Sequence, residues 1–417
     1  MNENPSENTL EDIMTPEQLA EVRAYNRIDL RCTLLDRAVD FVFLAFFTFW
    51  LAKPVTEWLA GTFPWLAGRD YAHVAALLVT ATLFHAVISF PLSFYSGWML
   101  EKRFHLSNLT AFHWFRRYLL QLALSLILNT ALMLLLFSVV RTCGTWWWAV
   151  IAVVFFTLSV VLSTLMPTLL MRLFYHIEKL DDPGLSARFE ELIRPTPLKL
   201  SGIYRLDLSV ETQKANAMLA GLGRSRRVLL GDTLLQNFTE DEIIAVFAHE
   251  VGHQVRRHIL KLMLCMFLGS FAVFWLTDFG LRLWVGMDAG GMDAGVIDSL
   301  GRLDFLDFLG YSALPVWVAP FFVFALSVIS QILEPFQNAL SRKFEREADA
   351  YAVENCGNPS AMRSAFVKLA IQNKADPAPP AWEVFWLHSH PAIAERIANI
   401  EAWKPRLEEI SENSENF

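Results

Sequence analysis

The sequence predicts a mainly α-helical polytopic membrane protein, with about six transmembrane helices around a chamber and a small α+β domain at the cytoplasmic face. Of the 417 residues, 54% are hydrophobic and only 19% are charged, and the mean hydropathy is +0.34. Soluble chains carry about 25% charged residues, so this deficit indicates a bilayer as solvent. The net charge of −8 offers no basic surface, and nucleic acid is therefore excluded as a partner.

Residues 1–35 are predicted to form a polar or amphipathic segment ahead of the first span. The segment begins with acidic residues, among them Glu3 and Glu7, whereas a secretory signal peptide begins with basic ones. Membrane insertion is therefore expected to be directed by an internal span.

Six predominantly apolar windows approach the length of about 20 residues that a spanning helix needs. Residues 36–173 contain four of them and residues 258–340 contain two. The windows are 36–52, 73–98, 118–140, 145–173, 258–284 and 313–335. Lysine and arginine are concentrated in alternate connecting segments, which places both termini, the 101–117 loop and the 174–257 insert in the cytoplasm.

The cytoplasmic insert is predicted to hold a small sheet and one helix. Residues 203–208, 216–221 and 226–231 are short apolar stretches separated by polar or glycine-containing turns, a pattern typical of strands. Thr239 and Glu242 form a capping-box pattern ahead of an apolar run. A helix is therefore expected to begin at Thr239 and to continue into the fifth span.

The predicted helix carries His249, Glu250 and His253 in the pattern HExxH. Residues four apart lie on one helical face, so both imidazoles can bind one Zn²⁺ while Glu250 acts on the water beside them. His258 falls on a different face and is not expected to bind the metal. Because catalytic zinc usually has a third protein ligand, one zinc per chain is predicted, with its third ligand elsewhere.

The C-terminal cytoplasmic segment, residues 341–417, is predicted to be helical and supplies candidates for that ligand. Glu345 and Asp349 lie four apart on one helical face. Glu345 can therefore bind zinc while Asp349 accepts a hydrogen bond from a ligand imidazole and fixes its tautomer. Glu347 is expected to project elsewhere.

Three motifs occur in order along the chain: HEVGH at 249–253, SRKFEREAD at 341–349 and HSHP at 388–391. Together they resemble the signature of the integral-membrane zinc endopeptidases of the CaaX prenyl protease type. The resemblance implies His249, His253 and Glu345 as zinc ligands and Glu250 as the general base. The long charged insertion of the eukaryotic members is absent, so the chain resembles a prokaryotic member.

The same resemblance implies roles for further residues around the metal. Asp349 would hydrogen-bond to a ligand side chain without contacting the metal, and Arg396 would be a supporting cation beside the site. His390 would steady the oxyanion or the substrate carbonyl. Asn216 and Ala217 would lie on an edge strand that pairs with extended substrate.

The predicted function is a membrane-embedded zinc endopeptidase that hydrolyses peptide bonds near the cytoplasmic membrane face. Its substrates would be peptides or proteins, including lipid-anchored or membrane proteins, in CaaX-type processing or membrane-protein quality control. The predicted location is the bacterial inner membrane with the active site facing the cytoplasm, or the ER membrane in a eukaryote. Two alternatives stay open: a polytopic metal transporter or channel, and a catalytically inactive scaffold.

Overall fold

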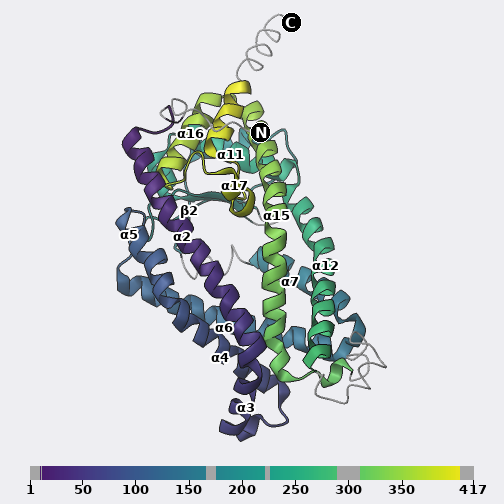
Figure 1. The fold of residues 1–417 in the computed structure, drawn as a ribbon. Coiled ribbons are helices and arrows are strands. Elements are labelled where there is room, and N and C mark those ends of the chain that lie inside the picture. The colour runs from purple at the N-terminus through teal and green to yellow at the C-terminus, as the bar shows by residue number, and fades with distance from the viewer. Residues whose placement is uncertain (1–9, 11, 166–174, 221–225, 289–309, 404–417) are drawn as a thin grey trace, which may run out of the picture.

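The computed structural model describes residues 10, 12–165, 175–220, 226–288 and 310–403. The long helices extend from the end where α3 lies toward the opposite end, where the sheet and α16 lie (Figure 1). The α-helices are α2 (Pro16–Phe46), α3 (Ala52–Thr62), α4 (Asp70–Phe94), α5 (Glu101–Arg103), α6 (Ala111–Cys143), α7 (Trp147–Leu165), α9 (Pro183–Ile193), α10 (Asp232–Asn237), α11 (Glu240–Val255), α12 (His258–Asp288), α15 (Ala319–Cys356), α16 (Pro359–Gln372) and α17 (Ala381–Leu387).

Five helical stretches of the described chain are long and apolar enough to cross a membrane. They are Pro16–Thr62, Asp70–Arg103, Ala111–Ser163, His258–Val285 and Val316–Cys356. The third stretch contains both α6 and α7, which are separated at Gly144, where φ is 55°. The six predicted windows therefore fall on five stretches, and residues 166–173 of the fourth window lie outside the described residues.

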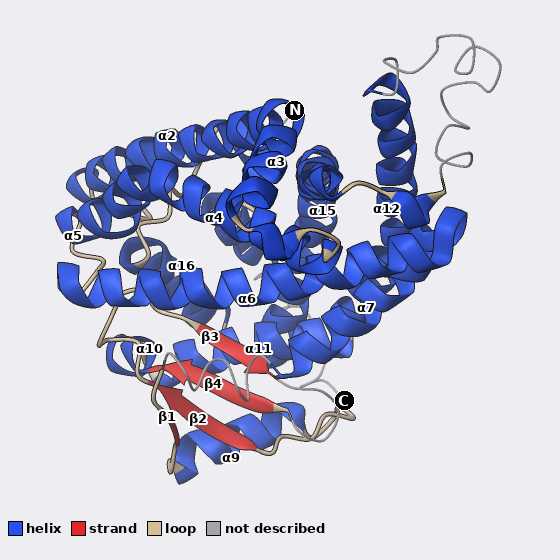
Figure 2. Ribbon diagram, turned by 90° about the horizontal axis from the view of Figure 1, so that it is seen from below, coloured by secondary structure: helices blue, strands red, loops and turns tan. Residues whose placement is uncertain are grey.

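A four-stranded sheet lies in the insert, with the strand order β1-β2-β4-β3 (Figure 2). The strands are β1 (Ile177–Lys179), β2 (Gly202–Leu206), β3 (Ala217–Ala220) and β4 (Arg227–Gly231). β2 and β4 are parallel, whereas β1 and β3 pair antiparallel with their neighbours. β2, β3 and β4 correspond to the three predicted strands. β1 was not predicted, because three residues are too few for an alternating pattern to stand out.

The helix that carries the HExxH motif begins as predicted and ends earlier than predicted. The capping box forms, with Thr239 as N-cap and the Glu242 side chain bonded back to it. Continuation into the fifth span is wrong, because α11 ends at Val255 and α12 starts at His258. Between them Arg257 has a φ of 56°, which a continuing helix does not allow.

Two long helices connect the apolar region to the sheet-containing end. α2 begins beside α16, where Met14 and Val22 are buried together with Met362 and Phe366 in one apolar cluster. From Pro16 on, the segment predicted as polar or amphipathic is therefore a helix packed on the C-terminal part of the chain, whereas its residues 1–9 and 11 lie outside the described residues. α15 runs beside α2, and Glu334 of α15 accepts two hydrogen bonds from Arg37, at 2.7 and 2.8 Å.

Candidate metal centre

The site is built where α11 crosses α15. Gly252 of α11 faces Ala348 of α15 so closely that a Cβ at Gly252 would lie 3.1 Å from the Ala348 Cα. This approach brings the histidines of α11 against the carboxylates of α15. Both helices bury the faces concerned, and His249, Glu345 and Asp349 are each at most 8% exposed.

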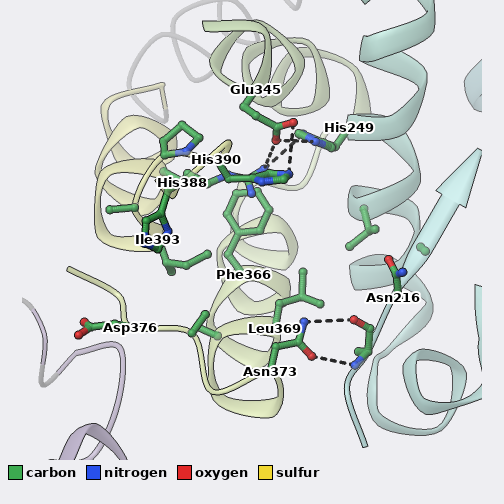
Figure 3. A pocket seen from close by; sticks show the side chains of 18 of the residues that line it. Asn216, His249, Glu345, Phe366, Leu369, Asn373, Asp376, His388, His390 and Ile393 are labelled. Atoms are coloured by element: carbon green, nitrogen blue, oxygen red, sulfur yellow. Dashed lines mark hydrogen bonds and ion pairs between the residues drawn. The ribbon is translucent and has the colours of Figure 1, made fainter. Parts of the chain in front are cut away.

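His249, His253 and Glu345 bring their ligand atoms close together, and Figure 3 labels two of them, His249 and Glu345. The Nε2 atoms of His249 and His253 are 3.1 Å apart. Each of these nitrogens lies 3.3 Å from an oxygen of Glu345. All three ligand atoms lie within 4.8 Å of one another, as they would around a single metal ion. The predicted ligands are thus brought together from positions about 90 residues apart in sequence.

The donor set fits zinc. Two imidazole nitrogens and one carboxylate oxygen form one of the usual ligand sets of catalytic zinc, with the fourth position open. Glu345 Oε2 is buried and makes no well-formed hydrogen bond within the described residues; His249 Nε2 at 3.3 Å and Arg396 Nη2 at 3.7 Å are its ion-pair contacts. A metal ion held by this oxygen and by the two imidazoles would satisfy the buried carboxylate more fully.

Asp349 and Arg396 fix the orientation of His249. The Nδ1 atom of His249 lies 2.8 Å from Asp349 Oδ1, so it can donate its proton there and leave Nε2 free for the metal. Arg396 donates to both oxygens of Asp349, at 2.6 and 2.8 Å. Burial would lower the pKa of His249, but the carboxylates of Asp349 and Glu345 outweigh it and raise the pKa to about 9, so a metal that binds at Nε2 must displace a proton.

His253 is fixed by a contact that the sequence analysis missed. Its Nδ1 atom lies 3.1 Å from Nδ1 of His258, whose Nε2 lies 3.1 Å from Glu347. His258 is outside the ligand group, as predicted, but the turn at Arg257 folds it back against His253. The sequence predicts an unbroken helix here, because no residue type at 256–257 signals a break.

Glu250 and His390 both line the pocket that contains the ligands. His390 Nε2 lies 3.5 Å from Glu345 Oε1, and its side chain is 62% exposed. His390 is carried by the segment after α17, whose backbone is held by Arg342: this side chain donates to the C=O groups of Val384 and His388, at 2.8 and 2.6 Å. A carboxylate and an exposed imidazole therefore line the pocket together with His249 and Glu345.

The pocket has a volume of about 470 Å³ and reaches the start of β3. Asn216 and Ala217 line it together with His249 and Glu345. Among the residues that the structure describes, β3 is an edge strand with β4 as its one neighbour in the sheet. The predicted edge residues Asn216 and Ala217 thus share one pocket with two of the predicted ligands, His249 and Glu345.

The comparisons with known proteins cover almost the whole chain. Residues 179–404 match the family model of peptidase family M48, and residues 2–176 match the model described as CAAX prenyl protease N-terminal, five membrane helices. An uncharacterized metalloprotease of Bacillus subtilis, YhfN, is 25% identical over 93% of this chain and 86% of its own length. The CAAX prenyl protease 1 of Saccharomyces cerevisiae is 27% identical over 79% of this chain and 71% of its own length. The crystal structure of S. mikatae Ste24p superposes with a TM-score of 0.73 at 22% identity, over 95% of this chain and 91% of that one.

Proposed function

The chain belongs to peptidase family M48, and from this membership and the site geometry we propose that it is a zinc-dependent endopeptidase with one zinc per chain. It is a membrane-embedded metalloprotease of that family. We assign His249, His253 and Glu345 as the metal ligands. The observation that carries the assignment is the convergence of their three ligand atoms on one position beside an exposed strand edge.

Each side chain has a role in peptide hydrolysis. Zn²⁺, when bound, would polarise the scissile carbonyl and promote ionisation of the attacking water. The Glu250 carboxylate takes a proton from that water and passes it to the leaving amine. His390 donates a hydrogen bond to the developing oxyanion, which its exposed position beside Glu345 supports.

Arg396 and Asp349 hold the His249 ring in place, and β3 holds the substrate. An extended peptide that pairs with the edge at Asn216 and Ala217 lies in the same pocket as the ligands. Main-chain pairing is largely indifferent to side-chain identity, so it suits several substrates.

The substrates we propose are the C-terminal parts of lipid-anchored or membrane proteins. The support is that several relatives are named CAAX prenyl protease and that the spans place the site at a membrane. We further propose a bacterial inner membrane location with the site on the cytoplasmic side. The similarity to YhfN of Bacillus subtilis and the positions of lysine and arginine support this choice.

The test compares wild type with Glu250→Gln, both purified in detergent. Zinc is quantified in each protein, and each digests a peptide library whose products are identified by mass. We expect one zinc per chain in both, and kcat lower by about 10²–10⁴-fold in the variant, because a base acts on water without holding the metal. Near-wild-type cleavage by Glu250→Gln would contradict the mechanism, and absence of zinc from the wild type would contradict the ligand assignment.

A further inference from the structure

The main-chain groups of β3 alternate between two directions. Asn216 accepts a hydrogen bond from the N–H of Gly231, so its C=O faces β4. In an antiparallel pair, every second residue bonds to the partner strand and the residues between them point away. The register of β3 with β4 therefore directs the N–H and C=O groups of Ala215, Ala217 and Leu219 away from β4.

A side chain already occupies the first of these outward positions. Asn373 directly follows α16, and its Oδ1 accepts a hydrogen bond from the Ala215 N–H at 2.8 Å. Its Nδ2 donates to the Ala215 C=O at 3.1 Å, and Figure 3 draws both bonds at the end of the pocket. A side-chain amide offers the acceptor and donor that a neighbouring strand would offer. At Ala215, Asn373 stands where the backbone of an added strand would otherwise lie.

Other contacts hold Asn373 in this position. Its own N–H donates to the C=O of Leu369, which ends α16. The next residue, Lys374, has a φ of 52°, and its C=O accepts a hydrogen bond from Asn26 of α2 at 2.7 Å. The amide is therefore fixed from both sides and does not swing aside freely.

We propose that Asn373 is a positioning residue that ends the substrate-binding edge at Ala217. The inference rests on the proposed function, in which extended substrate pairs with β3. A substrate antiparallel to β3 directs its carboxyl end toward Ala215, where the edge is already filled. The chain beyond the substrate residue opposite Ala217 must leave the edge, and the pocket continues there toward Asn26 and Asp376.

This arrangement determines how the protease responds to substrate length. Residues added on the carboxyl side of the cut gain no further main-chain hydrogen bonds to the sheet once the position opposite Ala217 is filled. A peptide that ends at the position opposite Ala217 thus already forms all of the main-chain hydrogen bonds that β3 offers on the carboxyl side of the cut. Specificity for the distance between the cut and the carboxyl terminus follows in part from Asn373.

The test uses peptides that share one sequence up to the cut and are extended residue by residue on its carboxyl side. For the full-length wild type, KM should stop falling once the position opposite Ala217 is filled. In Asn373→Ala the outward groups of Ala215 become available, so peptides two residues longer gain two hydrogen bonds. Their KM should fall about tenfold with kcat unchanged. Asn373→Asp fills the same space, so it should show no such gain.

Gln372→Ala is the matched control. Its side chain donates to the C=O of Gln213 at 2.7 Å and does not line the pocket, so its length profile should match wild type. The proposal is overturned if wild type continues to gain with length, if Asn373→Ala keeps the wild-type profile or loses activity equally at all lengths, or if Asn373→Asp gains as alanine does. A thermal melt shows whether Asn373→Ala is folded. If that variant does not fold, the length profiles of the wild type and of Asn373→Asp still decide the proposal. If the wild type cleaves no peptide at all, the proposed function fails and not this inference alone.

Discussion

Replacing Gly252 by alanine should separate the two helices that supply the metal ligands. A Cβ there would lie 3.1 Å from both the Cα and the O of Ala348, and 3.2 Å from the Cβ of Tyr351. Ordinary Cβ contacts lie at 3.4–4 Å, so the helices would have to move apart by a few tenths of an ångström. The atoms contacted are mainly backbone, which does not swing aside as a flexible side chain would.

The shift is small for the fold and large for a metal site. Overpacking typically costs about 1–3 kcal/mol, and the better helix propensity of alanine offsets about 1 kcal/mol of it. Metal–ligand distances, in contrast, tolerate only about 0.2 Å. We therefore expect Gly252→Ala to remain folded and to bind zinc about 10–100-fold more weakly, the range seen when the groups that support metal ligands are disturbed.

A chelator competition on the purified protein in detergent measures this affinity. The matched control is Gly269→Ala in α12, where an added Cβ meets no atom within 4 Å. The control should bind zinc as the wild type does. Wild-type zinc affinity in Gly252→Ala would refute the reasoning, because it would mean that the spacing of the helices does not set the ligand geometry.

Three further predictions concern the ligand, the edge and the helix start. Glu345→Ala should release zinc, measured by metal analysis, and stoichiometric zinc in that variant would exclude Glu345 as the third ligand. Leu219→Pro removes an N–H of β3 that points away from β4, so it should abolish cleavage while zinc content and melting temperature are retained. Met218→Pro removes an N–H directed at β4, so it should lower the melting temperature. Equal effects of the two variants would contradict the alternation of β3. Although burial raises it, hydrogen bonds from Lys368 and Ser364 hold the pKa of Glu242 below its usual value. The ionised Glu242 therefore adds to the free energy of unfolding above the unfolded pKa of about 4.3, and this contribution is lost as pH falls through the lower folded pKa. Glu242→Gln should lower the free energy of unfolding by about 1–3 kcal/mol at pH 7 and by little in acid. Denaturant melts that show the same loss at every pH would contradict this.

The sequence predicts those parts of the site that depend on local periodicity. Spacing alone places His249 and His253 on one helical face, and Glu345 and Asp349 on another, because a helix repeats every 3.6 residues. That these faces meet was expected because catalytic zinc needs a third protein ligand, and the family resemblance agreed with it. The structure adds the physical reason, which is the close approach of the helices at Gly252.

Other features depend on backbone conformation that residue types do not reveal. The turn that places His258 against His253 follows from one residue, Arg257, in a left-handed conformation that is unusual for arginine. The hydrogen bond between Asn373 and Ala215 joins positions 158 residues apart. From sequence alone, an asparagine directly after a helix indicates only an ordinary helix end. The alternation of β3 was also open, since a short strand does not show by sequence which of its N–H groups face its neighbour.

The position of the metal relative to the membrane follows from α15 being both a span and a ligand helix. Its apolar part extends to the predicted window end at 335, and Glu345 follows after about three helical turns, near 15 Å along the axis. Between them, Asn338 and Arg342 hold the backbone of the α17 segment, which carries His390. Because one continuous helix carries the span, the proposed third ligand and the anchor of this loop, it sets the distance between the proposed metal site and the end of the apolar stretch. A substrate anchored in the bilayer would therefore present to the metal only a peptide bond at a matching distance from its anchor.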